Sequence, residues 1–168
     1  EQLTDTLPVP VVSVIEPGVS ALVQTTRNKR VGVIGTVGTI DSGAYEHAVG
    51  AADASVSLVS AACPGLVEFV ERGQTSGPEV TLLAQRLLAP IVDAGVDSLL
   101  LGCTHYPYLS EVIGQVMGSG VKLINSADAT ASVVREALAK NKIARNVDTR
   151  ERGSHEFYSS GDILHFAE

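Results

Sequence analysis

The sequence has little of what membrane, secreted or disulfide-bonded proteins depend on. Its 168 residues contain no tryptophan, one methionine and two cysteines. Two cysteines without a secretory signal indicate reduced thiols, not a disulfide framework. No apolar run approaches the ~18 residues of a membrane-spanning helix, and the first residues lack the basic and apolar regions of a signal peptide. We therefore expect a soluble, cytoplasmic protein that does not enter the membrane.

Positive charge is also scarce. Twelve basic residues face nineteen acidic ones, so the net charge is -7. The densest basic stretch is residues 27–30, which is too short to follow a nucleic-acid backbone. An anionic small molecule remains possible, because backbone amides at helix N-termini can hold a carboxylate without lysine or arginine.

What the sequence does have is an alternation of apolar strand runs with helical patterns. The apolar and β-branched runs predict strands at residues 9–15, 31–35, 55–61, 96–101 and 122–124. Helical periodicity and capping signals predict helices at residues 19–25 and 44–54, from a cap at Ser76 to Gly95, at 107–117, and from a cap at Ser126 to about Lys140. The alternation predicts an α/β fold, a parallel sheet with helices on both faces. The structure after Asn141 is left open.

Ligands of open parallel sheets bind at the carboxyl ends of the strands. That rule selects three loops, at residues 36–39, 62–65 and 102–107. The third carries Cys103, Thr104 and His105 at the start of a predicted helix, where the helix dipole and the imidazole both favour a thiolate. The alternative is a buried, inert cysteine beside a capping threonine and a turn histidine, and the residue types alone leave the two readings even.

Five segments, taken in order, resemble those of one enzyme family. The run Leu-Leu-Leu-Gly-Cys-Thr-His-Tyr-Pro at residues 99–107 resembles the second cysteine motif of bacterial glutamate racemases. The other four similar segments are Pro-Val-Val-Ser-Val-Ile-Glu-Pro at 10–17, Val-Gly-Val-Ile-Gly-Thr through Ser-Gly-Ala-Tyr at 31–45, Ala-Cys-Pro through Phe-Val-Glu-Arg-Gly at 62–73, and Leu-Ile-Asn-Ser-Ala at 123–127. The residues of these segments are most similar to those of actinobacterial racemases.

The resemblance implies an architecture of two similar α/β domains that face each other across a substrate cleft, the second inserted within the first. On that pattern, residues 1–16 end the opening segment of the first domain. Residues 17–124 form the whole inserted domain, and residues 125–168 return to the first domain and include a C-terminal tail. A homodimer is also expected.

The family activity that this implies is the racemisation of L-glutamate to D-glutamate for peptidoglycan synthesis, without cofactor or metal. One cysteine removes the α-proton and another returns a proton to the opposite face. Cys103 would serve one face, His105 would tune its proton and contact the substrate, and Glu71 would orient His105.

The resemblance also implies substrate-binding roles and one structural cysteine. Thr104 would hold the substrate carboxylate or amine, and Thr36 and Thr39 would face the same cleft. Gly38 stands where the family usually has alanine, a departure close to these two threonines. Cys63 matches a separate family cysteine, which we interpret as structural.

A larger departure concerns the first catalytic cysteine. The family has an early Asp-Ser-Gly motif and an Ala-Cys-Asn-Thr/Ser-Ala motif, and neither is present in these 168 residues. We therefore expect this chain to be inactive alone. Two alternatives are a one-cysteine relative, such as a decarboxylase of the same superfamily, and a non-catalytic, truncated binding domain.

Overall fold

The protein is built on one parallel sheet of four strands. The computed structural model describes residues 2–145, 154 and 156–161, and in them the strands lie in the order β2-β1-β3-β4. All three strand pairs are parallel, as predicted. The strands are β1 (Arg30–Gly35), β2 (Ser57–Ala62), β3 (Ser98–Leu101) and β4 (Lys122–Asn125).

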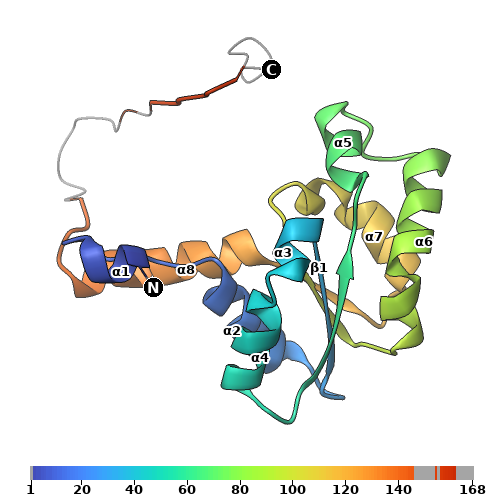
Figure 1. The fold of residues 1–168 in the computed structure, drawn as a ribbon, viewed down its shortest axis with the longest axis horizontal. Coiled ribbons are helices and arrows are strands. Elements are labelled where there is room, and N and C mark those ends of the chain that lie inside the picture. Colours follow the sequence, from blue (N-terminus) through green and yellow to red (C-terminus); the bar gives the residue numbers. More distant parts are fainter. Residues whose placement is uncertain (1, 146–153, 155, 162–168) are drawn as a thin grey trace.

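Helices cover both faces of this sheet (Figure 1). The helices are α1 (Gln2–Thr6), α2 (Ile15–Thr25), α3 (Val37–Asp41), α4 (Ala44–Ala52), α5 (Leu66–Glu71), α6 (Pro78–Asp93), the 3-10 helix η1 (Tyr106–Leu109), α7 (Ser110–Met117) and α8 (Ser126–Lys140). Residues of α5, α6, η1 and α7 pack on one face of the sheet, and residues of α2 and α4 pack on the other. The predicted α/β class, with helices on both faces, is confirmed.

Strand β3 shows why its sequence reads as one apolar run. All four of its residues are buried. Leu99 and Leu101 face the cluster formed with α6 and α7, whereas Leu100 faces the cluster formed with α2 and α4. A strand covered on both faces has no solvent side, so its side chains need not alternate in polarity. Burial of this strand holds the loop that follows it in a defined place.

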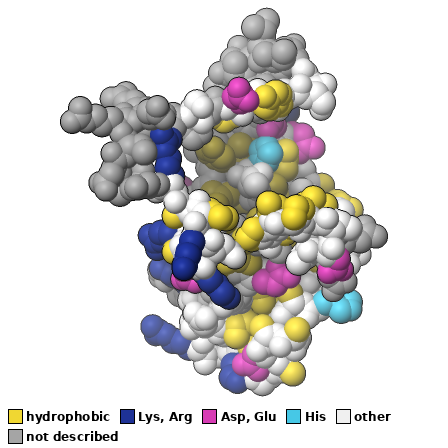
Figure 2. Space-filling view, turned by 90° about the vertical axis from the view of Figure 1, so that its left-hand side faces the viewer, with side chains coloured by type: hydrophobic (Ala, Val, Ile, Leu, Met, Phe, Trp, Pro, Cys, Tyr) yellow, Lys and Arg dark blue, Asp and Glu magenta, His cyan; other side chains and the backbone are white. Residues whose placement is uncertain are grey.

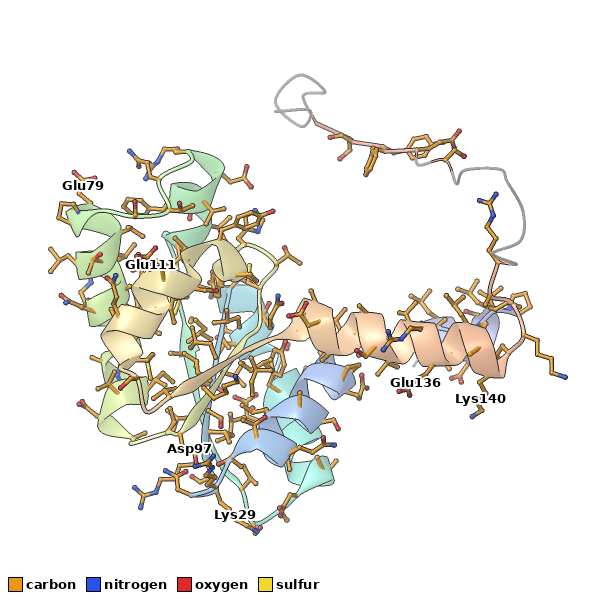
Figure 3. The ribbon with its side chains drawn as sticks, turned by 180° about the vertical axis from the view of Figure 1, so that it is seen from behind. Lys29, Glu79, Asp97, Glu111, Glu136 and Lys140 are labelled. Carbon is orange, nitrogen blue, oxygen red and sulfur yellow. The ribbon has the colours of Figure 1, made fainter. Side chains whose placement is uncertain are left out.

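The long helix α8 differs from the rest because it extends away from the sheet. Figure 1 shows α8 reaching out past the sheet, and Figure 3 shows Glu136 and Lys140 on the part that lies beyond the sheet. Helix α8 has no buried residue, and Leu138 is 38% exposed. Seen from the left-hand side of Figure 1, the surface of the protein shows several hydrophobic side chains (Figure 2). In the described part of the chain, no helix is both long and apolar enough to cross a membrane.

The predicted strand at residues 9–15 is wrong. In the structure this segment is irregular, and α2 begins at Ile15, where the Ser13 hydroxyl accepts a hydrogen bond from the Ile15 amide at 3.1 Å. A strand needs a partner, and none of the four described strands pairs with this segment. Pro10 also lacks an amide hydrogen for a ladder. The segment has the apolar pattern of a strand, but it has no partner strand among the described residues.

Helix boundaries show smaller corrections. The short helices α3 and α5 were not predicted, because each has too few residues for a periodic pattern. Gly77, not Ser76, occupies the cap position of α6. Asn125 caps α8, with its side chain accepting from the Ala127 amide at 2.9 Å, so Ser126 is the first helical residue instead of the cap.

Candidate functional site

The loops after β1, β2 and β3 begin side by side at one edge of the sheet. The register pairs Gly35 with Ala62 and Ile34 with Leu101. Two further backbone hydrogen bonds extend these pairings beyond the strands: the Cys63 amide donates to the Gly35 carbonyl at 2.9 Å, and the Gly102 amide donates to the Ile34 carbonyl at 2.8 Å. The three loops selected from the sequence therefore start from a common edge.

Three of the predicted residues form a row at this edge. The Cys103 Sγ lies 3.8 Å from Nδ1 of His105, and Nε2 of His105 lies 2.5 Å from Oε1 of Glu71 at the end of α5. The Glu71 carboxylate can only accept, so it selects the tautomer with hydrogen on Nε2. Nδ1 is then free to accept the thiol proton of Cys103. The row therefore links a thiol to a base and the base to a carboxylate.

Partial exposure makes this row accessible to a small molecule. Cys103 is half-buried, and the side chains of His105 and Glu71 are 31% and 49% exposed. At that exposure the ion pair alone adds little to stability. Its geometric consequence, which is the orientation of the imidazole, is what the site can use.

A buried tyrosine anchors the loop that carries the row. Tyr106 is fully buried, and its hydroxyl donates to the carbonyl of Cys63 at 3.1 Å. Burial raises the pKa of Tyr106, and nearby negative charge at Cys63, Cys103 and Glu68 raises it further, so the hydroxyl stays protonated and remains a donor. Because Cys63 follows β2, this hydrogen bond holds the second and third loops together.

The predicted substrate-binding threonines lie at the same edge in two groups. Thr104 is exposed, and its Oγ1 lies 3.4 Å from Nδ1 of His105. Thr36 caps α3, and its Oγ1 lies 2.9 Å from Oγ1 of Thr39. Thr36 follows β1 directly, next to the loop of Cys103. The described hydrogen bonds do not link the Thr36 and Thr39 pair to Cys103, so a shared ligand would have to bridge the two groups.

Cys63 has surroundings opposite to those of Cys103. It is 1% exposed within the core, and its Sγ lies 3.8 Å from the carbonyl of Ala61. Burial raises the pKa of the Cys63 thiol to about 12. A thiol that is shielded and kept neutral is a poor nucleophile or base. This environment fits the structural reading of Cys63.

One site neighbour was missed from the sequence. Tyr45 of α4 is 3% exposed, and its hydroxyl and Cε2 each lie 3.1 Å from the point that a Cβ on Gly102 would occupy. Burial raises the pKa of Tyr45, and the negative charge of Cys103 raises it further. The signal was present, because the Ser-Gly-Ala-Tyr segment was part of the resemblance. A buried aromatic residue on a helix is nevertheless first interpreted as core.

Neither metal-binding side chains nor the groove between α2 and α4 offers an alternative to the Cys103 loop among the described residues. Among the described residues, no group of three or more histidine, cysteine, aspartate or glutamate side chains could hold a metal ion. A groove of about 810 Å³ lies between α2 and α4, and its lining contains none of the predicted site residues. The Cys103 loop therefore remains the candidate site on the basis of its functional groups.

Comparison with known proteins identifies the family of this chain. Residues 1–134 match the family model described as Asp/Glu/hydantoin racemase. The chain is 51% identical over 159 residues to a glutamate racemase of Parafrankia sp. (strain EAN1pec) and 48% identical over 160 residues to one of Corynebacterium glutamicum. These matches cover 95% of this chain but 57% and 58% of those proteins. The chain thus spans a little over half the length of the curated relatives it matches.

Solved structures give the same assignment. A glutamate racemase isoform of Bacillus anthracis superimposes with a TM-score of 0.81 at 39% identity, covering 84% of this chain and 53% of that one. A Francisella tularensis glutamate racemase in complex with D-glutamate gives a TM-score of 0.80 at 32% identity, covering 87% of this chain and 54% of that one.

Proposed function

The chain belongs to the Asp/Glu/hydantoin racemase family, and on that premise we propose that it supplies one half of a glutamate racemase active site. The observation that carries this proposal is the row of Cys103, His105 and Glu71 at the carboxyl edge of the sheet. The names of the matched relatives support glutamate as the substrate.

In the proposed reaction the Cys103 thiolate removes the α-proton of one enantiomer. The Cα–H bond breaks, an S–H bond forms, and the electron pair stays on the carbon and spreads into the substrate carboxylate. His105 first accepts the thiol proton at Nδ1, and Glu71 holds the resulting imidazolium through Nε2. The α-proton is weakly acidic, so fixed donors must stabilise the carbanion-like transition state. Cys103 can also act in reverse, as the acid on the same face.

The hydroxyl groups at this edge supply candidate donors for the substrate. Thr104 lies beside His105, whereas Thr36 and Thr39 lie on the neighbouring strand end. We propose that they hold the carboxylate or amine of glutamate between the two groups. Such contacts would fix the Cα–H bond toward Cys103, which is the geometric requirement of proton abstraction.

Inversion requires a second proton-transfer group on the opposite face. We propose that this group is a cysteine outside the 168 residues, and that residues 17–124 are the inserted domain of a two-domain racemase. Residues 1–16 and 125–168 then belong to the other domain. The buried hydrophobic core of the described residues supports this division, because it runs from Val19 to Ile124. A cytoplasmic homodimer that serves peptidoglycan synthesis is part of the same proposal, and sedimentation would test the dimer.

The test uses deuterated water. The 168-residue chain, incubated with L- or D-glutamate, should not racemise either enantiomer by circular dichroism. A chimera that adds the unmatched portion of the Corynebacterium glutamicum relative should racemise both and should exchange the α-proton by NMR. Racemisation by the 168-residue chain alone would contradict the single-face assignment. Release of carbon dioxide in place of inversion would favour the decarboxylase alternative, and binding without turnover would favour a non-catalytic domain.

A further inference from the structure

A buried tyrosine with an uncommitted hydroxyl lies directly behind the Cys103 loop. Helix α4 begins after Gly43, whose φ of +65° turns the chain, and Tyr45 lies in the first turn of the helix. The side chain is 3% exposed, and its hydroxyl makes no hydrogen bond within the part of the chain that the structure describes. No fully buried side-chain oxygen of the described residues lacks a partner, so this hydroxyl retains contact with solvent at the sheet edge.

The ring of Tyr45 explains the glycine that precedes Cys103. A Cβ at position 102 would lie 2.8 Å from the Ile34 carbonyl oxygen and 3.1 Å from both Cε2 and the hydroxyl of Tyr45. Backbone and ring therefore close on Gly102 from two sides. Any larger residue would displace one of them, and Cys103, the next residue, would move with it.

The hydroxyl of Tyr45 is also coupled electrostatically to the thiol. Burial raises the pKa of Tyr45, and the negative charge of an ionised Cys103 raises it further. By reciprocity, an ionised Tyr45 would disfavour the Cys103 thiolate, and the raised pKa of Tyr45 keeps its hydroxyl protonated as a donor. Two other titratable groups near the thiol among the described residues are His105, which Glu71 holds, and Tyr106, whose hydroxyl donates to the Cys63 carbonyl. Tyr45 is the neighbouring phenol with its donor still available.

We infer that Tyr45 is a positioning residue for Cys103: its ring fixes Gly102 against β1, and its hydroxyl donates to the thiolate once that thiolate forms. Charge-assisted hydrogen bonds are shorter and stronger than neutral ones. The donor therefore favours the thiolate over the thiol, on the side away from His105. The inference rests on the proposed function only in that the proposed reaction requires a thiolate at Cys103. The thiolate itself can be measured without any substrate.

The experiment follows alkylation of Cys103 by iodoacetamide against pH in the 168-residue chain, with the modified cysteine identified by mass spectrometry. Tyr45→Phe should slow this alkylation roughly tenfold at neutral pH, because the thiolate loses a hydrogen-bond donor. Tyr106→Phe is the matched control, because it also removes one buried hydroxyl next to this loop. It should lower thermal stability and leave the alkylation profile of Cys103 within about threefold of the wild type.

An unchanged profile in a folded Tyr45→Phe variant would overturn the inference, and so would equal shifts in both variants, which would indicate general loosening of the loop. A reciprocal measurement covers the case in which Tyr45→Phe does not fold. In a Tyr106→Phe background, Cys103→Ala should lower the pH at which one tyrosine ionises, read as tyrosinate absorbance, and an unchanged titration would contradict the coupling. Neither result depends on glutamate turnover, so the proposed function can fail separately.

Discussion

The loops that carry Cys63 and Cys103 begin alike and end with opposite chemistry. Each follows a strand of the same parallel sheet and starts at the same edge. Cys63 is enclosed in the core, with a raised pKa and its sulfur 3.8 Å from the Ala61 carbonyl. Cys103 is half-buried and faces an imidazole that a carboxylate orients. Position at a strand end is therefore not enough, because exposure and an adjacent base decide whether a thiol can react.

The largest expected difference between the two loops is in thiol reactivity. In the folded chain near pH 8, iodoacetamide should modify Cys103 at least ~100-fold faster than Cys63, because Cys63 is shielded and almost wholly protonated. Peptide mapping by mass spectrometry would measure both rates in one sample. In denaturant the two rates should converge. Comparable rates in the folded chain would remove the contrast.

Removing the His105 base should lower the alkylation rate of Cys103 toward that of Cys63. His105→Ala should slow alkylation of Cys103 about tenfold at neutral pH, because the thiol loses the acceptor of its proton and less thiolate forms. Glu71→Gln should have a smaller effect, about threefold, because it acts only through the orientation of His105. His47→Ala is the control, since His47 is exposed and bonded to the Gly43 carbonyl at 2.9 Å. If the control slowed the reaction as much as His105→Ala, the assignment to His105 would be wrong.

The same substitution at two glycines of this edge should have opposite effects on stability. Gly102→Ala should destabilise the chain by roughly 2 kcal/mol, because the new methyl group would lie 2.8 Å from a backbone oxygen. Gly38→Ala should stabilise it by about 0.5 kcal/mol, because Gly38 is in α3 and a Cβ there meets nothing within 4 Å. Denaturant unfolding would measure both. Equal effects would mean that the contacts at Gly102 relax freely.

Alkaline pH should weaken the protein through Cys63. The folded state holds the Cys63 proton to about pH 12, whereas the unfolded thiol loses it near pH 9. Between these values the unfolded state binds fewer protons, so the free energy of unfolding falls as pH rises, by about 1 kcal/mol from pH 8 to 10. Burial of Tyr45 and Tyr106 acts in the same direction at higher pH. Cys63→Ala should flatten the pH 8–10 decline in urea unfolding. An identical slope in that variant would contradict the buried, neutral thiol.

Much of the sheet and part of the candidate site could be predicted from the sequence. Strand β3 and the Cys103 loop could be predicted because a continuous apolar run, a glycine and a proline mark a buried strand and a helix start. The pairing of Glu71 with His105 came from the family resemblance, since 34 positions separate them and α5 was not predicted at all. In the structure the His105 Nε2 and the Glu71 Oε1 lie 2.5 Å apart.

What could not be predicted depended on partners distant in the sequence. Residues 9–15 have a strand's composition, but β-structure exists only in pairs, and a single segment does not reveal whether its partner is present. Tyr45 was missed for the converse reason. Its local context indicates a core residue of α4, and only the packing of that helix against the end of β3 places its hydroxyl near Cys103.

We propose that Cys103, and not Cys63, transfers the α-proton of glutamate. The direct measurement is α-proton exchange in deuterated water by the chimera that carries the unmatched portion of the Corynebacterium glutamicum relative, in Cys103→Ala and Cys63→Ala forms. Cys103→Ala should abolish racemisation and exchange of the enantiomer whose α-hydrogen faces Cys103, whereas Cys63→Ala should retain both activities in the fraction that folds. Normal racemisation by the Cys103→Ala chimera would contradict the assignment.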